Sequence, residues 1–183
     1  FVRMETDGLT ILPTHRVIHS LANFDWPSFI SAARTNFEIE QVSGAGPNHA
    51  AAFRDRLAQA GHDRPSIGVY AGAERSLILR LRDDVHLEDL LPDLPASVAR
   101  LDVVILHRLL LEGVLGIDSR AVREERNLHY VREFDGALGQ VDQGKAQISF
   151  LLNPTPIEAV RDNALAGHAL PQKSTDFYPK LLS

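Results

Sequence analysis

The feature that most constrains the fold is a strongly apolar strand pattern that runs directly into a proline-bounded turn and a helix pattern. Residues 146–152 (AQISFLL) form a nearly continuous apolar run, which predicts a strand buried on both faces. Pro154 and Pro156 bracket Thr155, and we expect Thr155 to cap a helix that ends near Gly167. A strand and a helix joined this tightly favour a sheet covered by helices.

The rest of the chain continues this alternation, with one hairpin. Residues 66–70 and 75–82 are β-rich runs separated by a short polar turn, which predicts antiparallel pairing. We therefore expect one compact α/β domain over residues 1–183, with α+β character and a mixed β-sheet flanked by helices. The other expected strands cover residues 8–13, 36–42 and 128–131. The other expected helices are one that starts at Pro27 with Asp25 as its cap, one over residues 49–60 with Asn48 as its cap and its end at Gly61, and one over residues 134–141.

The longest helix is expected over residues 98–115. Its apolar residues exceed one face, which predicts either burial on more than one side or a spare face that forms a homodimer interface. His107 lies inside this apolar pattern, where a lone histidine is usually a core or boundary residue, and we leave it out of the predicted site.

Composition narrows the class of protein. The chain has no cysteine, which excludes a disulfide framework and a thiolate metal site. Lysine and arginine are dispersed among acidic residues and the formal net charge is -5, which disfavours binding to nucleic acid or an anionic membrane. Charged residues interrupt the longest apolar stretch, which falls short of the roughly 18 apolar residues of a membrane span. We expect a cytoplasmic location, and no pattern in the chain identifies a cofactor.

The C-terminal segment PQKSTDFYPK is the densest group of hydrogen-bond donors and cations. Lys173 supplies a flexible charge, Ser174 and Thr175 supply hydroxyl groups, and consecutive backbone amides there can surround an anion. Tyr178 and Lys180 complete this predicted ligand-binding loop. The alternative is a proline-bounded surface loop whose aromatic residues pack on the domain.

A second polar cluster, PTHR, follows the first expected strand. Arg16 can bind an oxyanion through two parallel hydrogen bonds, and His15 titrates near neutral pH and is the candidate catalytic acid or base. The alternative is an ion-paired Arg16 and a hydrogen-bonded surface His15. A metal bound by His15 and His19 is disfavoured because no third ligand is near, so no metal site is expected.

Asn153 stands where the buried strand gives way to the following turn. A helix N-terminus just beyond it favours an anion by about 0.3 to 1 kcal/mol when exposed. We include Asn153 among the ligand-binding residues, together with Arg16 and the residues of the C-terminal loop.

A resemblance to a known family covers nearly the whole chain. It rests on GLTILPTHR near the start, SIGVYAGAERSLILRLR in the middle, and DQGKAQISFLLNPTPIEAV with LPQKSTDFYPKLLS at the end. These segments resemble the C-terminal half of domain-of-unknown-function family 1015, a bacterial and archaeal family without an established activity. The resemblance implies a missing N-terminal half, in keeping with a chain that opens on Phe1 and stops at Ser183. By analogy, that half resembles the ParB and sulfiredoxin class, which includes serine kinases.

Three functional hypotheses remain open. The first is a protein that binds a phosphorylated small metabolite or nucleotide, with phosphotransferase activity as its extension. The second is a module that senses an anionic metabolite without converting it. The third is a scaffold that dimerises through residues 101–115. The chain has no Walker A motif and no kinase signature, so a phosphoryl-transfer site would need residues from outside it.

Overall fold

Short strands form a six-stranded sheet and a separate two-stranded ribbon. This computed structural model describes residues 10–44, 46, 48–171 and 173–178. Two central strands of the larger sheet are buried at every residue, which accounts for their continuous apolar patterns. In spatial order the sheet contains β3 (Phe37–Gln41), β5 (Ser76–Leu81), β4 (Ser66–Tyr70), β7 (Ile148–Leu152), β2 (His15–Ile18) and β6 (Leu128–Val131).

Neighbouring strands of the six-stranded sheet alternate in direction. Each of its ladders is antiparallel, so the expected mixed sheet is corrected, whereas the fold class of a sheet flanked by helices is confirmed. The predicted hairpin is present, with Ser66 opposite Arg80 and Tyr70 opposite Ser76. Its turn contains a short 3-10 helix, η1 (Ala73–Arg75).

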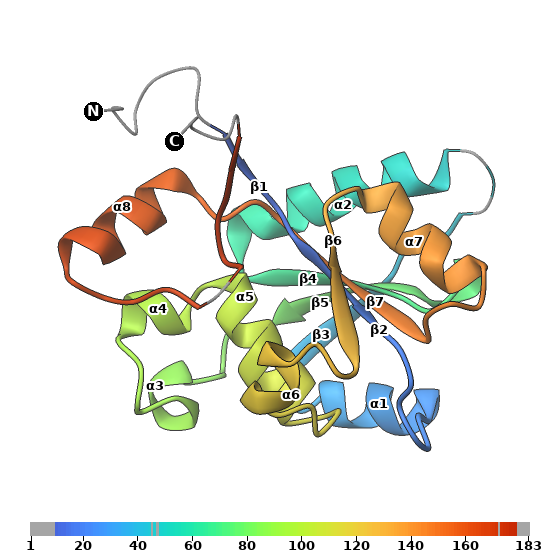
Figure 1. Ribbon diagram of the computed structural model, residues 1–183, viewed down its shortest axis with the longest axis horizontal. Helices are drawn as coiled ribbons and strands as arrows, with labels where there is room; N and C mark the ends of the chain where they lie inside the picture. The colour runs from blue at the N-terminus through green and yellow to red at the C-terminus, as the bar shows by residue number, and fades with distance from the viewer. Residues whose placement is uncertain (1–9, 45, 47, 172, 179–183) are drawn as a thin grey trace.

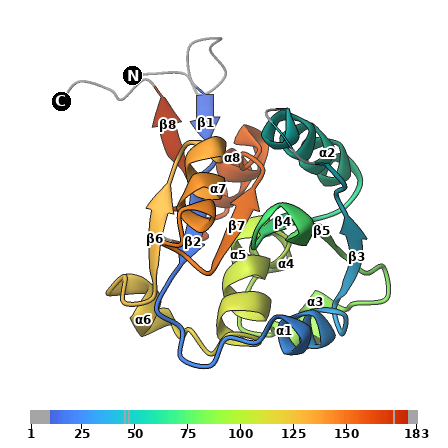
Figure 2. The same ribbon diagram turned by 90° about the vertical axis from the view of Figure 1, so that its right-hand side faces the viewer.

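The two-stranded ribbon joins the two ends of the described chain. β1 (Thr10–Leu12) pairs antiparallel with β8 (Asp176–Tyr178), and Thr10 lies opposite Tyr178. Figures 1 and 2 show this ribbon extending beyond one end of the large sheet. The chain passes from β1 directly into β2, so the ribbon continues into the sheet interior.

Helices cover both faces of the six-stranded sheet (Figure 1). On one face, α2 (His49–Asp63) and α7 (Phe134–Asp142) pack around Phe53 and Phe134 against Leu151 of β7. The other face carries a larger apolar cluster. The helices around that cluster are α1 (Trp26–Ala33), α3 (Leu87–Leu90), α4 (Ala96–Ala99), α5 (Asp102–Ile105) and α6 (Ser119–Arg123).

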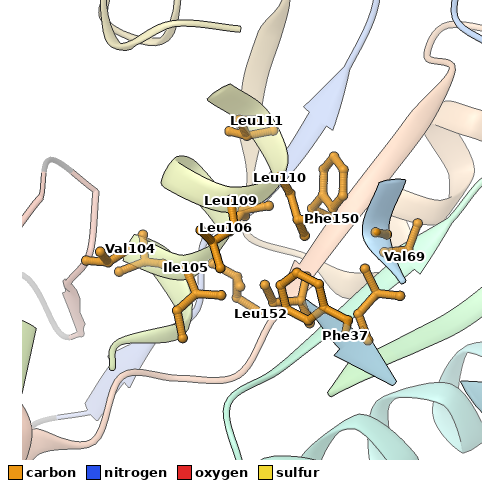
Figure 3. Close-up of a cluster of buried hydrophobic side chains, with 14 of the residues drawn as sticks. Phe37, Val69, Val104, Ile105, Leu106, Leu109, Leu110, Leu111, Phe150 and Leu152 are labelled. Atoms are coloured by element: carbon orange, nitrogen blue, oxygen red, sulfur yellow. The ribbon is translucent and has the colours of Figure 1, made fainter. Parts of the chain in front are cut away.

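The single long helix expected over residues 98–115 is wrong. The chain breaks at Arg100 and Leu101 between α4 and α5, and α5 continues as a π-helical segment, η2 (Leu106–Glu112). The longest helix among the described residues is α2 instead. Figure 3 shows the apolar side chains of α5 and η2 gathered near sheet residues that include Phe150. Burial within the chain therefore accounts for the extra apolar content, and the homodimer stays a prediction.

Only some of the helix caps and helix ends predicted from the sequence are present in the structure. The Asp25 carboxylate caps α1 by accepting a hydrogen bond from the Ser28 amide at 2.9 Å, as expected. By contrast, α2 continues past Gly61, and Asn48 makes no side-chain cap. The last helix, α8 (Ile157–Leu165), follows Pro156 without a side-chain cap, so the capping role of Thr155 is wrong. No helix in the described part of the chain is long and apolar enough to span a membrane.

Candidate functional site

The two polar segments expected to share a site do lie together. The β1–β8 ribbon brings the chain after Pro171 alongside the chain before His15. Arg16 Nη2 donates a hydrogen bond to the Lys173 carbonyl oxygen at 3.2 Å, across 157 positions of sequence. The predicted proximity is confirmed, while the binding roles of these residues are proposals.

Arg16 is fully buried in the middle of β2, and not at a polar strand end as expected. Its guanidinium also donates to the carbonyl of Thr14 and, through Nε, to His107 Nε2 at 3.3 Å. The Arg16 Cζ atom lies 5.2 Å from the centroid of the Tyr130 ring. Burial lowers the pKa of Arg16 to about 10. Among the described residues its hydrogen-bond partners include no carboxylate, so the expected acid-paired alternative is also wrong.

Lys173 projects from the loop that Arg16 holds. Its side chain is exposed, its φ of 62° lies in the left-handed region, and its Nζ lies 5.6 Å from the Tyr130 centroid. Ser174 is buried, and its hydroxyl donates to the Pro171 carbonyl. The Thr155 hydroxyl donates to the Ser174 carbonyl at 2.9 Å. The loop is therefore fixed from two sides, and one of these contacts comes from the turn after β7.

The other predicted residues of the loop lie along or beyond β8. Thr175 is partly buried just before that strand, and Tyr178 is 60% exposed at its end. Between them Asp176 accepts a hydrogen bond from Arg132 Nη2 at 3.0 Å, which attaches β8 to the end of β6. Lys180 lies outside the described residues.

His15 has an environment that disfavours acid–base chemistry near neutral pH. The side chain is 1% exposed, its Nδ1 accepts a hydrogen bond from the Leu152 amide at 3.2 Å, and the Phe134 ring packs edge-on against it. Burial, then the charge of Arg16, lowers the pKa of His15 to about 4. The catalytic role of His15 stays a prediction, and the geometry favours a structural one.

His107 contacts the buried cluster although sequence reasoning left it out. It lies in the π-helical segment η2, and its Nε2 accepts the hydrogen bond from Arg16. Burial, then the charge of Arg16, lowers the pKa of His107 to about 3, so this imidazole is neutral at ordinary pH. The sequence did contain one signal for this role, a histidine among leucines. A neutral imidazole in such a position can accept a hydrogen bond from a buried donor such as Arg16.

A cleft of about 310 Å³ opens beside this cluster, at the end of β7. Its wall includes Asn153, Thr155 and the residues at the junction of α4 and α5. Asn153 Nδ2 donates to the Leu57 carbonyl of α2 at 3.3 Å, which fixes the amide against the helix. Of the predicted ligand-binding residues, Asn153 alone lines this cleft within the described part of the chain, and Thr155 connects the cleft to the Lys173 loop.

Asp102 is the titratable group of the cleft that sequence reasoning missed. As a residue it is partly exposed at the cleft wall, yet its carboxyl group lies in poorly solvated surroundings. Burial raises the pKa of Asp102 to about 7, although the nearby Ser66 amide and Asn153 side chain oppose the shift. A carboxyl that titrates near neutral pH inside a cleft is a physical mark of a functional site. In the sequence Asp102 was visible only as an interruption of an apolar pattern.

Two arginines line the same cleft. Arg64 at the end of α2 is engaged, with Nη2 at 2.7 Å from Glu38 Oε2 and Nη1 at 3.2 Å from Asp83 Oδ1. Arg100 is exposed and forms no ion pair or side-chain hydrogen bond within the part of the chain that the structure describes. The cleft thus combines an available cation with a carboxyl group and an amide. No group of three or more histidine or acidic residues placed to hold a metal occurs within the described ranges.

A comparison with family models shows to which family the chain belongs. A model described as a protein of unknown function, DUF1015, matches residues 1–104. The chain belongs to the DUF1015 family. The matched part of this DUF1015 chain runs from its N-terminus into α5 and includes Arg16 and Asp102, while Asn153 and the Lys173 loop lie beyond it. No curated protein matches the chain.

Solved structures resemble the DUF1015 chain in fold. A free serine kinase in complex with AMP is 11% identical with a TM-score of 0.52, and the match covers 96% of this chain and 56% of the kinase. A conserved hypothetical protein from Pyrococcus furiosus is 11% identical with a TM-score of 0.53, over 96% of this chain and 59% of that protein. At such identities the likeness concerns the fold. The chain spans less than two thirds of the length of these proteins.

Proposed function

We propose that this chain binds a phosphorylated small metabolite or a nucleotide in the cleft at the end of β7. The observation that carries the proposal is the cleft itself, where Asn153 and Arg100, an exposed residue without an ion pair among the described residues, line one cavity. A volume of about 310 Å³ is at the small end of the range for ligand pockets, which suits a small metabolite. Guanidinium and amide groups are donors suited to phosphate oxygens.

The Lys173 loop extends the proposed binding surface. Thr155 lines the cleft and also holds the Ser174 carbonyl, so the loop begins where the cleft wall ends. A nucleotide, which is larger than a simple phosphorylated metabolite, would extend from the cleft over this loop, where Lys173 is exposed. Thr175 and Tyr178 remain proposed ligand-binding residues of this surface, and so does Lys180, which lies outside the described residues. Ser174 is buried with its hydroxyl engaged, so its proposed part is to hold the loop in place.

Phosphoryl transfer is a further step of the same proposal. The fold resembles that of free serine kinases whose structures contain AMP or ADP, and a phosphotransferase of small metabolites is the activity such a fold suggests. The chain spans about 56% of those kinases, so a complete reaction would draw on a longer protein. Within this chain, the engaged donors of Arg16 and the burial of His15 favour binding over catalysis at the buried cluster.

The test is a thermal-shift series with inorganic phosphate, phosphoserine, serine, ADP and ATP. A ligand at a hundred times its dissociation constant adds about 2.7 kcal/mol, which raises the melting temperature of a chain of this size by about 5 to 10 °C. We expect the phosphorylated compounds to stabilise the protein and serine to have a smaller effect. Arg100→Ala should remove most of the shift.

The matched control is Arg34→Ala, since Arg34 is an equally exposed arginine at the end of α1 and lines no part of the cleft. It should leave the ligand-induced shift unchanged. The proposed site would be contradicted if Arg100→Ala kept the full ligand-induced shift in melting temperature, or if no anion shifted the melting temperature.

A further inference from the structure

Three separate segments contribute to the wall of the cleft, since Gly61 comes from α2, Asp102 begins α5 and Asn153 follows β7. Ser66, the first residue of β4, follows the lining residue Pro65. The Ser66 amide and the Asn153 side chain lie near enough to the Asp102 carboxyl group to favour its ionised form, against the effect of burial. A carboxyl group in poorly solvated surroundings therefore belongs to a residue of the cleft wall and has polar groups from two other elements beside it.

Gly61 has a specific relation to this arrangement. It lies inside α2, where alanine would stabilise the helix. A Cβ atom on Gly61 would lie 2.3 Å from Asn153 Nδ2, so any other residue would displace the amide that donates to the Leu57 carbonyl and influences the pKa of Asp102. The glycine therefore permits the observed position of the Asn153 amide at a cost to helix propensity.

The charges around Asp102 leave its carboxyl group without a close cation. From α2, Arg64 is directed to Glu38 and Asp83, and Asp63 adds an exposed acidic group. Arg100 lines the cleft from the α4–α5 junction, and the start of α8 contributes only uncharged residues to the lining. Since no salt bridge holds Asp102 in its ionised form within the described residues, this group can gain or lose a proton when a ligand arrives.

We infer that an anion in this cleft binds to the protonated form of Asp102, so that each bound anion is accompanied by one proton taken up at this carboxyl group. The inference rests on the proposed function, because it requires that the cleft receives anions. Ionised Asp102 would repel an anion at the short distances of this cavity, whereas the protonated group donates a hydrogen bond to it. The raised pKa of Asp102 agrees with this, because both forms are populated near neutral pH.

Sulfate and inorganic phosphate are probes that distinguish binding to protonated Asp102 from binding to ionised Asp102. Sulfate has only acceptor oxygens near neutral pH, so it requires a donor from the protein, and a protonated Asp102 provides one. Inorganic phosphate still carries a proton of its own, which an ionised Asp102 can accept. Isothermal titration in two buffers of different ionisation enthalpy, between about pH 6 and about pH 8, measures the protons taken up on binding.

The expected result is sulfate binding with uptake of about one proton above neutral pH, and an affinity that falls about tenfold per pH unit there. Asp102→Asn, which preserves the shape of a neutral acid, should bind sulfate with no proton uptake and little dependence on pH. Asp63→Asn is the matched control at the cleft rim and should retain the pH dependence of the unmodified protein. Gly61→Ala should weaken sulfate binding about tenfold at every pH while the far-UV circular dichroism spectrum stays unchanged.

The outcomes distinguish this inference from the proposed function. Binding of phosphate but not sulfate would mean that Asp102 acts ionised, which overturns the inference and keeps the proposed function. Sulfate affinity that is independent of pH, or an equal pH dependence in Asp102→Asn, would also overturn the inference and keep the proposed function. Absence of binding by sulfate, phosphate and ADP would overturn both.

Discussion

The buried cluster around Arg16 and the cleft around Asp102 use ionisable groups in opposite ways. Each centres on a charge-bearing side chain in poorly solvated surroundings without a close counter-ion among the described residues. Arg16 donates to two backbone carbonyls and His107, and the side chain is fully buried. Asp102 faces a cavity. A buried charge by itself therefore does not mark a binding site, whereas one that lines open space is a candidate.

The positions of Arg16 and Asp102 relative to the sheet explain this difference. Arg16 lies within β2, between β7 and β6, where loop and helix atoms pack over it. Asp102 lies where β4 begins, β7 ends and α5 begins, and ends of elements leave backbone groups and space that side chains or ligands can fill.

The largest expected effect concerns the buried cluster. Arg16→Ala should lower the free energy of unfolding by about 3 kcal/mol or more, because it creates a cavity and leaves the carbonyls of Thr14 and Lys173 without this donor. Urea unfolding measures the loss, and hydrogen exchange should show faster exchange in residues 173–178. Arg132→Ala, which removes a surface ion pair to the same loop, should cost only about 0.5 kcal/mol. A loss below about 1 kcal/mol for Arg16→Ala would contradict the structural role of the cluster.

The second prediction compares the two regions through pH. His15 and His107 have lowered pKa values of about 4 and about 3, so in acid the unfolded chain binds protons that the folded chain does not. Their contribution to stability therefore falls as the pH drops from about 6.5 to about 4. Asp102 has the opposite sign. Its raised pKa of about 7 means that the folded chain holds a proton that the unfolded chain has lost, so its contribution falls as the pH rises from about 4 to about 7.

Asp102→Asn separates these two contributions. The variant should be more stable than the unmodified protein at about pH 8, by about 2 kcal/mol, because it no longer buries an ionised carboxyl group. Its loss of stability between about pH 6.5 and about pH 4 should be larger by about 2 kcal/mol in total, since the opposing effect of Asp102 is gone. Urea midpoints across this range provide the measurement. Parallel profiles for the two proteins would show that Asp102 titrates normally.

The smallest expected effect concerns Lys173. Lys173→Ala should change the free energy of unfolding by about 0.5 kcal/mol, the value of an exposed contact between a cation and an aromatic ring. Lys173→Gly should be closer to neutral, because glycine tolerates the φ of 62° at this position. Sulfate affinity should fall less in Lys173→Ala than in Arg100→Ala. The reverse order would move the centre of the proposed site from the cleft to the loop.

Element types could be predicted from local patterns, but their interruptions could not. Alternation and turn residues identified the hairpin over 66–82 and the helix that Asp25 caps. The apolar pattern over residues 98–115 did not reveal the break at Arg100, because a buried helix and a broken one have the same composition when every side is covered. Thr155 had the chemistry of a cap, yet its hydroxyl donates to the distant Ser174 carbonyl instead.

The candidate site was predictable only in part. Local density of donors led to Lys173 and Ser174, and the position of Asn153 after a buried strand placed it at the cleft. Asp102 carried no such signal, because its pKa depends on burial and on nearby amides of Ser66 and Asn153, which are distant in sequence. Gly61 looked like a helix end, and its role depends on a side chain 92 positions away in the sequence, the difference between positions 153 and 61.

Strand and helix patterns, the hairpin, the absence of cysteine and the resemblance to the DUF1015 family could all be recognised in the amino-acid sequence. Which polar groups are engaged and which remain available depends on the folded arrangement. Arg16 and Lys173 are 157 positions apart, and their hydrogen bond exists only once the chain is folded. The physical reason is that burial and hydrogen-bond partners set the charge and the reach of a side chain, and both depend on residues distant in sequence.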